Sequence, residues 1–416
     1  MCRRARAVHG PRLPGRSRVS EPAVAARTIA PLYAAGFVTA FGAHSIAAGI
    51  GATGQDIGLD LLRMGALLAV YDLAEVFLKP VFGSLADRIG AKPVIVFGLL
   101  AFGIVSLVGL WSSNTIALAV ARLGQGAAAS AFSPASSATV ARLAAPGAKG
   151  RYFGRYGSWK GLGYTLGPLI GAALIFTGGF ALLFTILSAV AILTAFWVAV
   201  TLPRLDPLPR PRYTVADLVR QTTERGFLVP TLALAASTGA LGASIGFLPA
   251  MASGQDAPLL ASIALASVLA LSSTLTQPWA GRLRDSAHMS DRAGMALGLA
   301  TITTGTMTAA LVPALPGLYV AAGLLGIGIG FATPFAFAHL ADTTPHERMG
   351  RTMGTAELGR ELGDAGGPVL VGGIAVAATL PIGLAALALV VAAAGVSTRM
   401  LPRFPETTRD PRRPRD

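Results

Sequence analysis

Long apolar segments dominate this chain and limit what it can fold into. A helix that crosses the hydrocarbon core of a bilayer needs about 20 mostly apolar residues. Stretches of this kind follow one another near 29–50, 64–84, 93–111, 115–138, 154–177, 180–202, 228–251, 258–280, 293–312, 317–340, 353–376 and 380–400. Only 13% of the residues are charged, against about 25% in soluble domains. Because spanning segments must be helices or closed barrels, and these runs exceed barrel strands, we expect an all-α integral membrane protein.

The positive charges predict the orientation of these spans. If the N-terminus is cytoplasmic, the inner loops carry Arg88, Lys92, Arg142, Lys149, Arg151, Arg204, Arg210, Arg212, Arg220, Arg225, Arg282, Arg284, Arg292, Arg348 and Arg351. The outer loops carry only Arg63. Lysine and arginine accumulate in cytoplasmic loops, so both termini are expected inside. The net charge of +14 is therefore read as topology anchoring, and no nucleic-acid partner is expected.

The polar segments divide the chain into two halves. The longest interior polar segment, 203–226, separates six spans from six and is expected to be a cytoplasmic linker between bundles 29–202 and 227–401. The two ends, 1–28 and 402–416, are rich in arginine and proline and lack apolar periodicity. Such composition is typical of disorder, so basic cytoplasmic tails are expected there.

The two halves also repeat in sequence. Three patterns recur 198 to 200 residues apart: K/Q-P-x-x-G-x-x-x-D at 79–87 and 277–285, G-R at 150–151 and 350–351, and G-x-x-x-G-P at 163–168 and 363–368. Within the same register Lys160 falls on Arg360. Duplicated six-helix halves with a substrate site between them are a plan of secondary transporters.

Three motifs carry a resemblance to a known family. The loop after span 64–84 has Gly83, Asp87, Arg88, Gly90 and Lys92; span 115–138 has Arg122, Gln125 and Gly126; span 154–177 has Gly163, Gly167, Pro168 and Gly171. On these motifs the chain resembles the major facilitator superfamily over essentially its whole hydrophobic length. The resemblance implies twelve transmembrane helices in two pseudo-symmetric six-helix bundles, and a protein that functions as a monomer.

The resemblance also implies roles for the three motifs. The loop motif implies a cytoplasmic latch, although its second copy has Ser286 where the first has Arg88. The Arg122 motif implies proton coupling, and the Gly163 motif implies the antiporter branch. Gly163 and Gly167 lie on one helix face, and small residues at this spacing let helix backbones approach closely. The stripe is therefore either plain packing or packing that permits two bundles to rock.

Ionisable residues inside spans are costly and usually functional. Span 64–84 holds Asp72, Glu75 and Lys79 within an arc of about 60°, and span 353–376 holds Glu357, Arg360, Glu361 and Asp364 within about 100°. If these spans face each other across the two halves, Lys79 can pair with an acid of the second group, and Glu75 with Arg360. Lys79, Lys160, Arg360 and Glu357 are the expected gate or cavity charges.

The same charges suggest a route for protons. Asp72 or Glu75 is the first choice for the coupled proton, and Glu361 or Asp364 the second; a static salt-bridge network is the alternative. Arg122 either acts on protons through a neighbouring acid or reaches the outer interface. Lys160 either faces the cavity or contacts span 258–280.

The leading function is secondary transport. The chain has one cysteine, Cys2, and lacks phosphate-loop, H-E-x-x-H and G-x-S-x-G motifs, so no metal, cofactor or enzymatic activity is expected. We expect proton-coupled export of small amphipathic compounds or drugs in a bacterial inner membrane. The alternative is a proton-coupled symporter or facilitator for a metabolite such as an organic anion. A membrane-embedded enzyme or a sensor on the same fold is a third reading, for which the sequence offers no chemistry.

Overall fold

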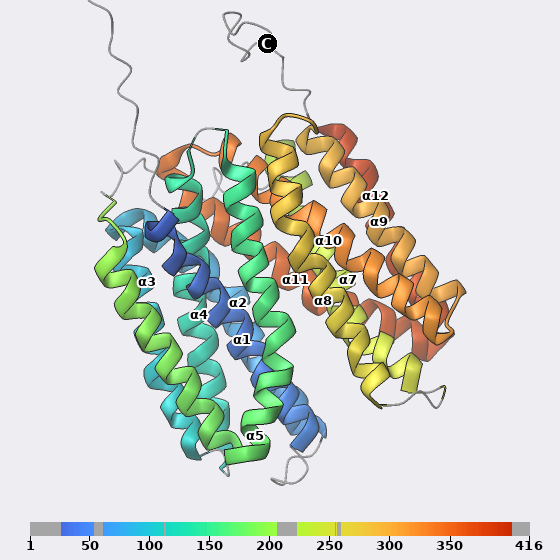
Figure 1. Cartoon of the computed structure of the whole chain (residues 1–416), viewed down its shortest axis with the longest axis horizontal. Coiled ribbons are helices and arrows are strands. Elements are labelled where there is room, and N and C mark those ends of the chain that lie inside the picture. The colour runs from blue at the N-terminus through green and yellow to red at the C-terminus, as the bar shows by residue number, and fades with distance from the viewer. Residues whose placement is uncertain are drawn as a thin grey trace, which may run out of the picture.

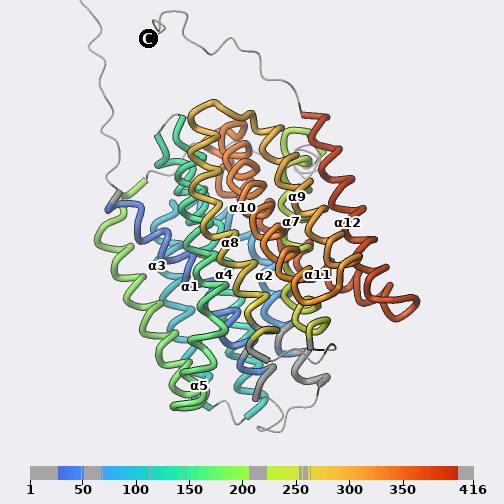
Figure 2. Tube along the Cα trace, turned by 45° about the vertical axis from the view of Figure 1, so that its right-hand side comes forward, coloured from blue at the N-terminus to red at the C-terminus, as the bar shows by residue number. Residues whose placement is uncertain are grey.

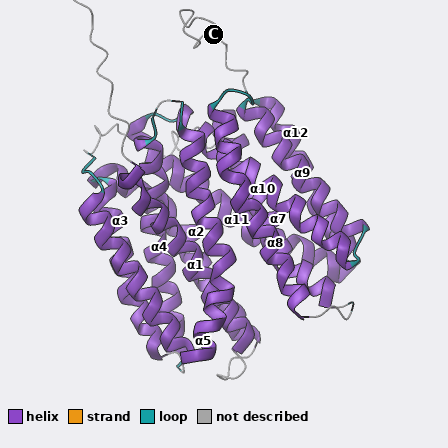
Figure 3. Ribbon diagram, viewed as in Figure 1, coloured by secondary structure: helices purple, strands orange, loops and turns teal. Residues whose placement is uncertain are grey.

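The computed structural model describes residues 26–53, 61–111, 114–145, 147–205, 223–253, 255 and 259–401. Over these ranges the chain is helical throughout, joined by short loops (Figure 3). The linker segment 206–222 and the tails 1–25 and 402–416 lie outside the described residues. The predictions made for the tails and most of the linker therefore stay predictions.

The described part of the first half is built from five helices, the last of which comprises two spans. They are α1 (Ala26–Thr53), α2 (Leu61–Ile89), α3 (Ala91–Ser106) with the 3-10 turn η1 (Leu107–Trp111), α4 (Thr115–Leu143) and α5 (Lys149–Thr201). The long α5 is two spans joined at Gly178 and Gly179, whose backbone angles are not helical. Gly179 has a φ of 67°, a conformation that glycine adopts without steric cost.

The second half repeats this arrangement. Its helices are α7 (Arg225–Ser253), α8 (Leu259–Asp285), α9 (Asp291–Leu311), α10 (Leu315–Thr343), α11 (Met349–Ala377) and α12 (Leu380–Ser397), with the 3-10 turns η2 (His346–Arg348) and η3 (Thr398–Met400). Counting α5 as two, the described residues therefore form twelve long helices in two groups of six, as predicted.

Seven described segments are long and apolar enough to cross a membrane by length and composition: 27–47, 91–111, 149–201, 225–252, 291–311, 315–343 and 380–400. The helices that fall short are α2, α4, α8 and α11. Two of these, α2 and α11, carry most of the intramembrane charges, and α4 is polar but largely buried. Charged helices remain compatible with a bilayer when they face the protein interior rather than lipid.

The two bundles lie side by side and join at one end (Figure 1). Contacts between the halves come chiefly from α2 with α11 and from α5 with α8, with α10 against α5 and α4 against α11. The joined end is the one at which α1 begins and α12 ends, and the bundles separate toward the other end (Figure 1). The molecule is therefore closed at the end at which α1 begins and α12 ends.

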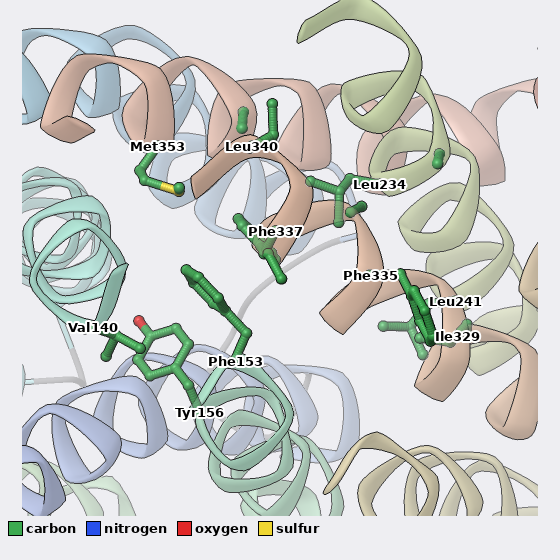
Figure 4. Packing of buried hydrophobic residues seen from close by; sticks show 14 of the residues in the cluster. Val140, Phe153, Tyr156, Leu234, Leu241, Ile329, Phe335, Phe337, Leu340 and Met353 are labelled. Atoms are coloured by element: carbon green, nitrogen blue, oxygen red, sulfur yellow. The ribbon is translucent and has the colours of Figure 1, made fainter. Parts of the chain in front are cut away.

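An apolar layer seals the closed end. The rings of Phe153 on α5 and Phe337 on α10 stack with centroids 5.5 Å apart, and Figure 4 shows them facing each other beside Val140 and Met353. All four side chains are buried. Burial of apolar surface between the halves stabilises this closed arrangement.

Candidate functional site

Lys79 is the centre of a buried charge cluster that joins the two halves. Its Nζ lies 3.1 Å from Glu75 Oε2 on its own helix α2, and 2.5 Å from Glu361 Oε1 on α11. Glu357 Oε2 on α11 is 3.9 Å away. The Lys79 side chain is 1% exposed, so these pairs are shielded from water and count for more than surface pairs.

The expected pairing is confirmed for Lys79 and wrong for Glu75. Lys79 contacts acids of α11, but Glu75 contacts Lys79 rather than Arg360. The Arg360 guanidinium turns back along its own helix, where Nη1 lies 3.2 Å from Glu357 Oε2. This contact joins residues three apart on one face of α11.

Lys160 joins the cluster from α5. Its Nζ lies 3.6 Å from Glu357 Oε2 and 6.0 Å from the centroid of the Tyr156 ring. The partner of Lys160 is therefore on α11 and not on α8. Glu357 is 0% exposed, and its Oε2 forms ion pairs with Lys79, Lys160 and Arg360. A buried carboxylate with three cations around it is compensated for its loss of water.

Three carboxylates of the cluster crowd together. Oxygen atoms of Asp72, Glu75 and Glu361 all lie within 4.8 Å of one another, and the Tyr71 hydroxyl donates to Glu75 Oε1 at 3.4 Å. The Lys79 ammonium already supplies a positive charge to Glu75 and Glu361. Asp72 is exposed and the Glu361 side chain is 17% exposed, whereas Glu75 is buried, so Asp72 is the most accessible of the three acids.

The cluster has unequal numbers of acids and bases. The groups whose charges act on one another are the acids Asp72, Glu75, Glu357, Glu361 and Asp364 and the bases Lys79, Arg122, Lys160 and Arg360. If every group were ionised, the cluster would hold one uncompensated negative charge. A single bound proton would neutralise it, and an uncompensated charge at this depth is unfavourable.

Arg122 extends the cluster along α4. It is 2% exposed, its Cζ lies 4.3 Å from the centroid of the Tyr71 ring, and its Nε donates to the Leu67 carbonyl at 3.4 Å. Nη1 of Arg122 has no hydrogen-bond partner among the described residues. Arg122 is therefore buried against α2 and does not reach the interface.

The rest of the helix-4 motif is structural. Gln125 Nε2 donates to Ser106 Oγ at 2.8 Å, which holds α4 against α3. A side chain at Gly126 would collide with the Tyr71 carbonyl oxygen. Glycine at 126 therefore lets α2 approach α4 closely enough to place Tyr71 under Arg122.

Asp87 caps a helix of the other half. Its Oδ1 accepts from the Gly350 N–H and its Oδ2 from the Arg351 N–H, both at 2.8 Å. These are orphan donors in the first turn of α11, and a negative charge there is also favoured by the helix dipole. Burial raises the pKa of Asp87 to about 6, although the N–H groups of Arg351 and Gly350 act to lower it. The carboxylate is therefore ionised at neutral pH.

The second copy of this motif makes the same contact on the opposite seam. Asp285 accepts from the N–H groups of Gly150 and Arg151, both at 2.8 Å, and so caps α5. Its lack of an arginine at position 286 does not prevent the cap. The closed end is held by two equivalent caps related by the internal repeat.

The backbone N–H groups that donate to the two aspartates belong to residues 150–151 and 350–351. In the sequence these residues stood out only as a repeated Gly-Arg pair. Each glycine has a reason in the structure. A Cβ at Gly83 would meet the Gly350 carbonyl, and one at Gly281 would meet the Gly150 carbonyl. Only hydrogen fits at these two crossings of the halves.

The remaining loop-motif residues shape the turn after α2. Gly90 has a φ of 93°, a conformation that favours glycine. Lys92 Nζ donates to the Leu202 carbonyl at 2.6 Å and so satisfies the end of the second span of α5. Arg88 is exposed. These residues hold the loop in place beside the Asp87 cap.

The helix-5 motif packs within its own half. Cβ atoms at Gly163 and Gly171 would press on α1 at Phe41 and Ser45, and Gly167 faces the same helix. In the second half, Gly363 and Gly367 face α7 in the same way. The stripe lets α1 and α5 approach closely, as its spacing predicted, and it does not lie at the junction of the halves.

A small cavity lies beside the cluster, between the two halves. It has a volume of about 40 Å³, enough for one or two waters. Lys160, Arg360, Tyr164, Thr238, Ser273 and Gln277 contribute to its lining. Gln277 is the repeat mate of Lys79, and it faces Gly157 where Lys79 faces Glu357. The α5–α8 seam is therefore neutral where the α2–α11 seam is charged.

These features define a membrane transporter: two repeated helix bundles, closed at one end, with intramembrane charges at their junction. The chain belongs to the Major Facilitator Superfamily, whose family model matches residues 32–286 and 230–416. Members of this family are transporters of small molecules rather than enzymes, and they typically work as monomers.

Individual relatives match over shorter stretches. The puromycin resistance protein pur8 of Streptomyces alboniger is 34% identical over 29% of this chain and 24% of its own length. The quinolone resistance protein NorA of Staphylococcus aureus is 29% identical over 28% and 30%, and a triacylglyceride transporter of Mycolicibacterium smegmatis is 25% identical over 46% and 38%. Each match thus covers well under half of the relative.

Solved structures match over nearly the whole chain. The human organic anion transporter MFSD10 has a TM-score of 0.72 at 18% identity, covering 89% of this chain and 99% of that one. The E. coli fucose:proton symporter FucP has a TM-score of 0.74 at 14% identity, covering 89% and 98%. A structure of FucP in the outward conformation matches equally well. At such identities the likeness shows the fold.

Proposed function

We propose that the protein exports small amphipathic compounds or drugs across a bacterial inner membrane in exchange for protons. The observation that carries the proposal is the Lys79–Glu361 pair, which spans the two halves within a cluster that holds one acid in excess. The similarity to proteins named for puromycin and quinolone resistance favours export of foreign compounds.

The proposed orientation places the closed end in the cytoplasm. Asymmetry of lysine and arginine supports it, since the loops of that end carry Arg142, Lys149 and Arg151 on one side and Arg282 and Arg284 on the other. In this orientation the structure is the outward-facing state, and both chain termini are cytoplasmic. Asp72, which is exposed, is then the acid that protons reach from outside.

Proton coupling follows from the charges at the junction. In the outward-facing state a proton reaches Asp72 from outside and passes to Glu75 or Glu361, which lie within 4.8 Å of it. Protonation of Glu361 removes the partner of Lys79 on the opposite half and weakens the contact between α2 and α11, whereas Glu75 pairs with Lys79 within α2 and relays the proton. The halves then separate at the cytoplasmic end, where the proton leaves and the exported compound enters.

A second candidate is uptake or facilitated passage of an organic anion. The observation that favours it is the pair of cations, Lys160 and Arg360, on the wall of the small cavity between the halves. The fold of the human organic anion transporter is similar. However, Glu357 already lies against both cations, so an anion would have to compete with it.

Growth inhibition in a host stripped of its own pumps tests the export proposal. Cells carrying the protein are challenged with antibiotics, dyes and organic acids, next to cells carrying Asp72→Asn/Glu75→Gln. We expect resistance to some compounds that the double variant loses. Glu347→Gln, in the exposed turn η2, is the matched control and keeps resistance. Equal amounts in the membrane are verified for all three.

Proteoliposomes separate the two candidates. If the protein exchanges compounds for protons, a compound to which it gives resistance should drive protons across the membrane in the direction opposite to its own movement. If anions are accumulated together with protons and no compound gives resistance, the organic anion candidate replaces the exporter. If Asp72→Asn/Glu75→Gln still moves substrate against its gradient, the assignment of the coupling acids is wrong.

A further inference from the structure

A groove on the outer side of the second half is unrelated to the charge cluster. It lies between α9 and α12, which run side by side at the edge of the molecule (Figures 1 and 2). Its volume is about 1230 Å³. It begins at the closed end, beside the loop that joins α8 and α9, and continues along both helices. None of the residues that line the groove lines the small cavity between the halves.

Arginines outnumber acids at the mouth of the groove, which is lined by Arg284, Arg292 and Arg399 and by Asp285 and Asp291. Arg292 at the start of α9 and Arg399 in η3 both line it, and neither has a carboxylate partner among the described residues. By contrast, Arg284 at the same mouth is neutralised by Asp291 at 2.6 Å and Asp342 at 2.6 Å. Two arginines thus remain available to an anionic ligand.

Beyond the mouth the groove is lined by small residues, most of them apolar. On α9 these are Ala296, Ala300 and Thr304, spaced by four residues, and on α12 Ala392 and Val396. From Arg292 to Thr304 the helix rises about 18 Å, close to the thickness of one leaflet of the hydrocarbon core, about 15 Å. The groove therefore has a charged end at headgroup level and a narrow apolar channel one leaflet deep.

We propose that this groove binds an anionic phospholipid of the cytoplasmic leaflet. Its phosphate contacts Arg292 and Arg399, and one acyl chain lies along Ala296 and Ala300 between α9 and α12. Basic pockets between transmembrane helices on the cytoplasmic side suit anionic headgroups. The leaflet assignment rests on the proposed orientation, whereas the groove and its charges do not depend on what the protein transports.

Native mass spectrometry of the full-length protein in detergent tests the proposal. The probes are phosphatidylglycerol, phosphatidylethanolamine and glycerol 3-phosphate. We expect phosphatidylglycerol to be retained preferentially, and Arg292→Gln/Arg399→Gln to weaken its binding roughly 30-fold. Arg282→Gln is the matched control, because Arg282 is exposed at the same end of the molecule but does not line the groove.

A second pair of variants tests the apolar channel without changing charge. Ala300→Trp fills the channel and should displace phosphatidylglycerol, whereas Leu297→Trp, on an exposed face outside the groove, should not. Unchanged phosphatidylglycerol binding by the double arginine variant would overturn the proposal. Displacement of the lipid by glycerol 3-phosphate would also overturn it, since that indicates a free phosphate site. So would retention of the lipid by Ala300→Trp, since the acyl chain would then lie elsewhere. Because lipid retention needs no substrate, failure here is distinguishable from failure of the transport proposal.

Discussion

At the scale of single residues, burial decides what each charge does. Lys79 and Lys149 each form an ion pair with an acid of the opposite half of the molecule. The Lys79 side chain is 1% exposed, whereas Lys149 is 14% exposed and its partner, Asp342, is 41% exposed. Water screens the second pair and not the first. The same kind of ion pair therefore contributes more to the stability of the fold at Lys79 than at Lys149.

Lys79→Met is expected to destabilise the protein strongly. It leaves Glu75 and Glu361 buried without their shared cation, and breaking a buried pair from one side costs about 3–5 kcal/mol. The matched control, Lys149→Met, should cost no more than about 1 kcal/mol. Thermal unfolding of the purified proteins in detergent measures both. Addition of Glu361→Gln to Lys79→Met should recover part of the loss; equal unfolding midpoints for the two lysine variants would contradict this account.

At the scale of elements, the two Asp caps turn helix ends into a latch. Asp87 on α2 caps α11, and Asp285 on α8 caps α5, each through two backbone N–H groups. Helix ends exchange such partners for water at modest cost, since their donors are satisfied either way. The caps therefore favour the closed end without making it permanent.

Asp87→Ala should loosen the closed end. Loss of a charged acceptor for two N–H groups is worth on the order of 2 kcal/mol, which changes the ratio of open to closed states about 30-fold. The probe is Ser273→Cys, placed in the closed cavity, with Cys2→Ser as background. Faster modification by a thiol reagent supplied from the side of the closed end is the expected result.

The latch test has two internal comparisons. Asp285→Ala should raise the labelling of position 273 by a similar amount, because it removes the equivalent cap. Glu347→Gln should leave labelling unchanged. If Asp87→Ala labels no faster than this control, the cap does not hold the halves together.

At the scale of the whole molecule, the arrangement of the bundles predicts which positions water reaches. Asp72 is exposed while Ser273 is 6% exposed, although both lie near the junction of the halves. The rocking of two rigid bundles is expected to exchange these exposures.

Thiol labelling from the two sides of the membrane tests whether the resting protein is in the outward-facing state. In the Cys2→Ser background, Asp72→Cys should react with an impermeant reagent added outside, and Ser273→Cys should be protected from both sides. In Ser273→Cys, which keeps the coupling acids, addition of a transported compound from the cytoplasmic side should remove the protection of position 273. Protection of position 72 with free access to position 273 in the resting protein would mean that the inward-facing state dominates.

Much of this protein was determined by its sequence alone. The lengths of the apolar runs predicted the helices, since a bilayer demands about 20 residues per span. The spacing of Gly163 and Gly167 predicted close helix packing, because residues four apart share a face. The helical periodicity of Asp72, Glu75 and Lys79 likewise placed them on one stripe of α2. All these features are local in the chain.

Only the tertiary structure decided which charges meet. Whether Lys79 pairs with Glu361, whether Arg360 turns to Glu357, and which helix receives Lys160 depend on the distance between helices that are far apart in sequence. The repeat showed that Asp87 and Asp285 are equivalent, but their backbone partners lie in the opposite half. Pairing energies fall steeply with separation and exposure, and neither quantity is contained in a one-dimensional pattern.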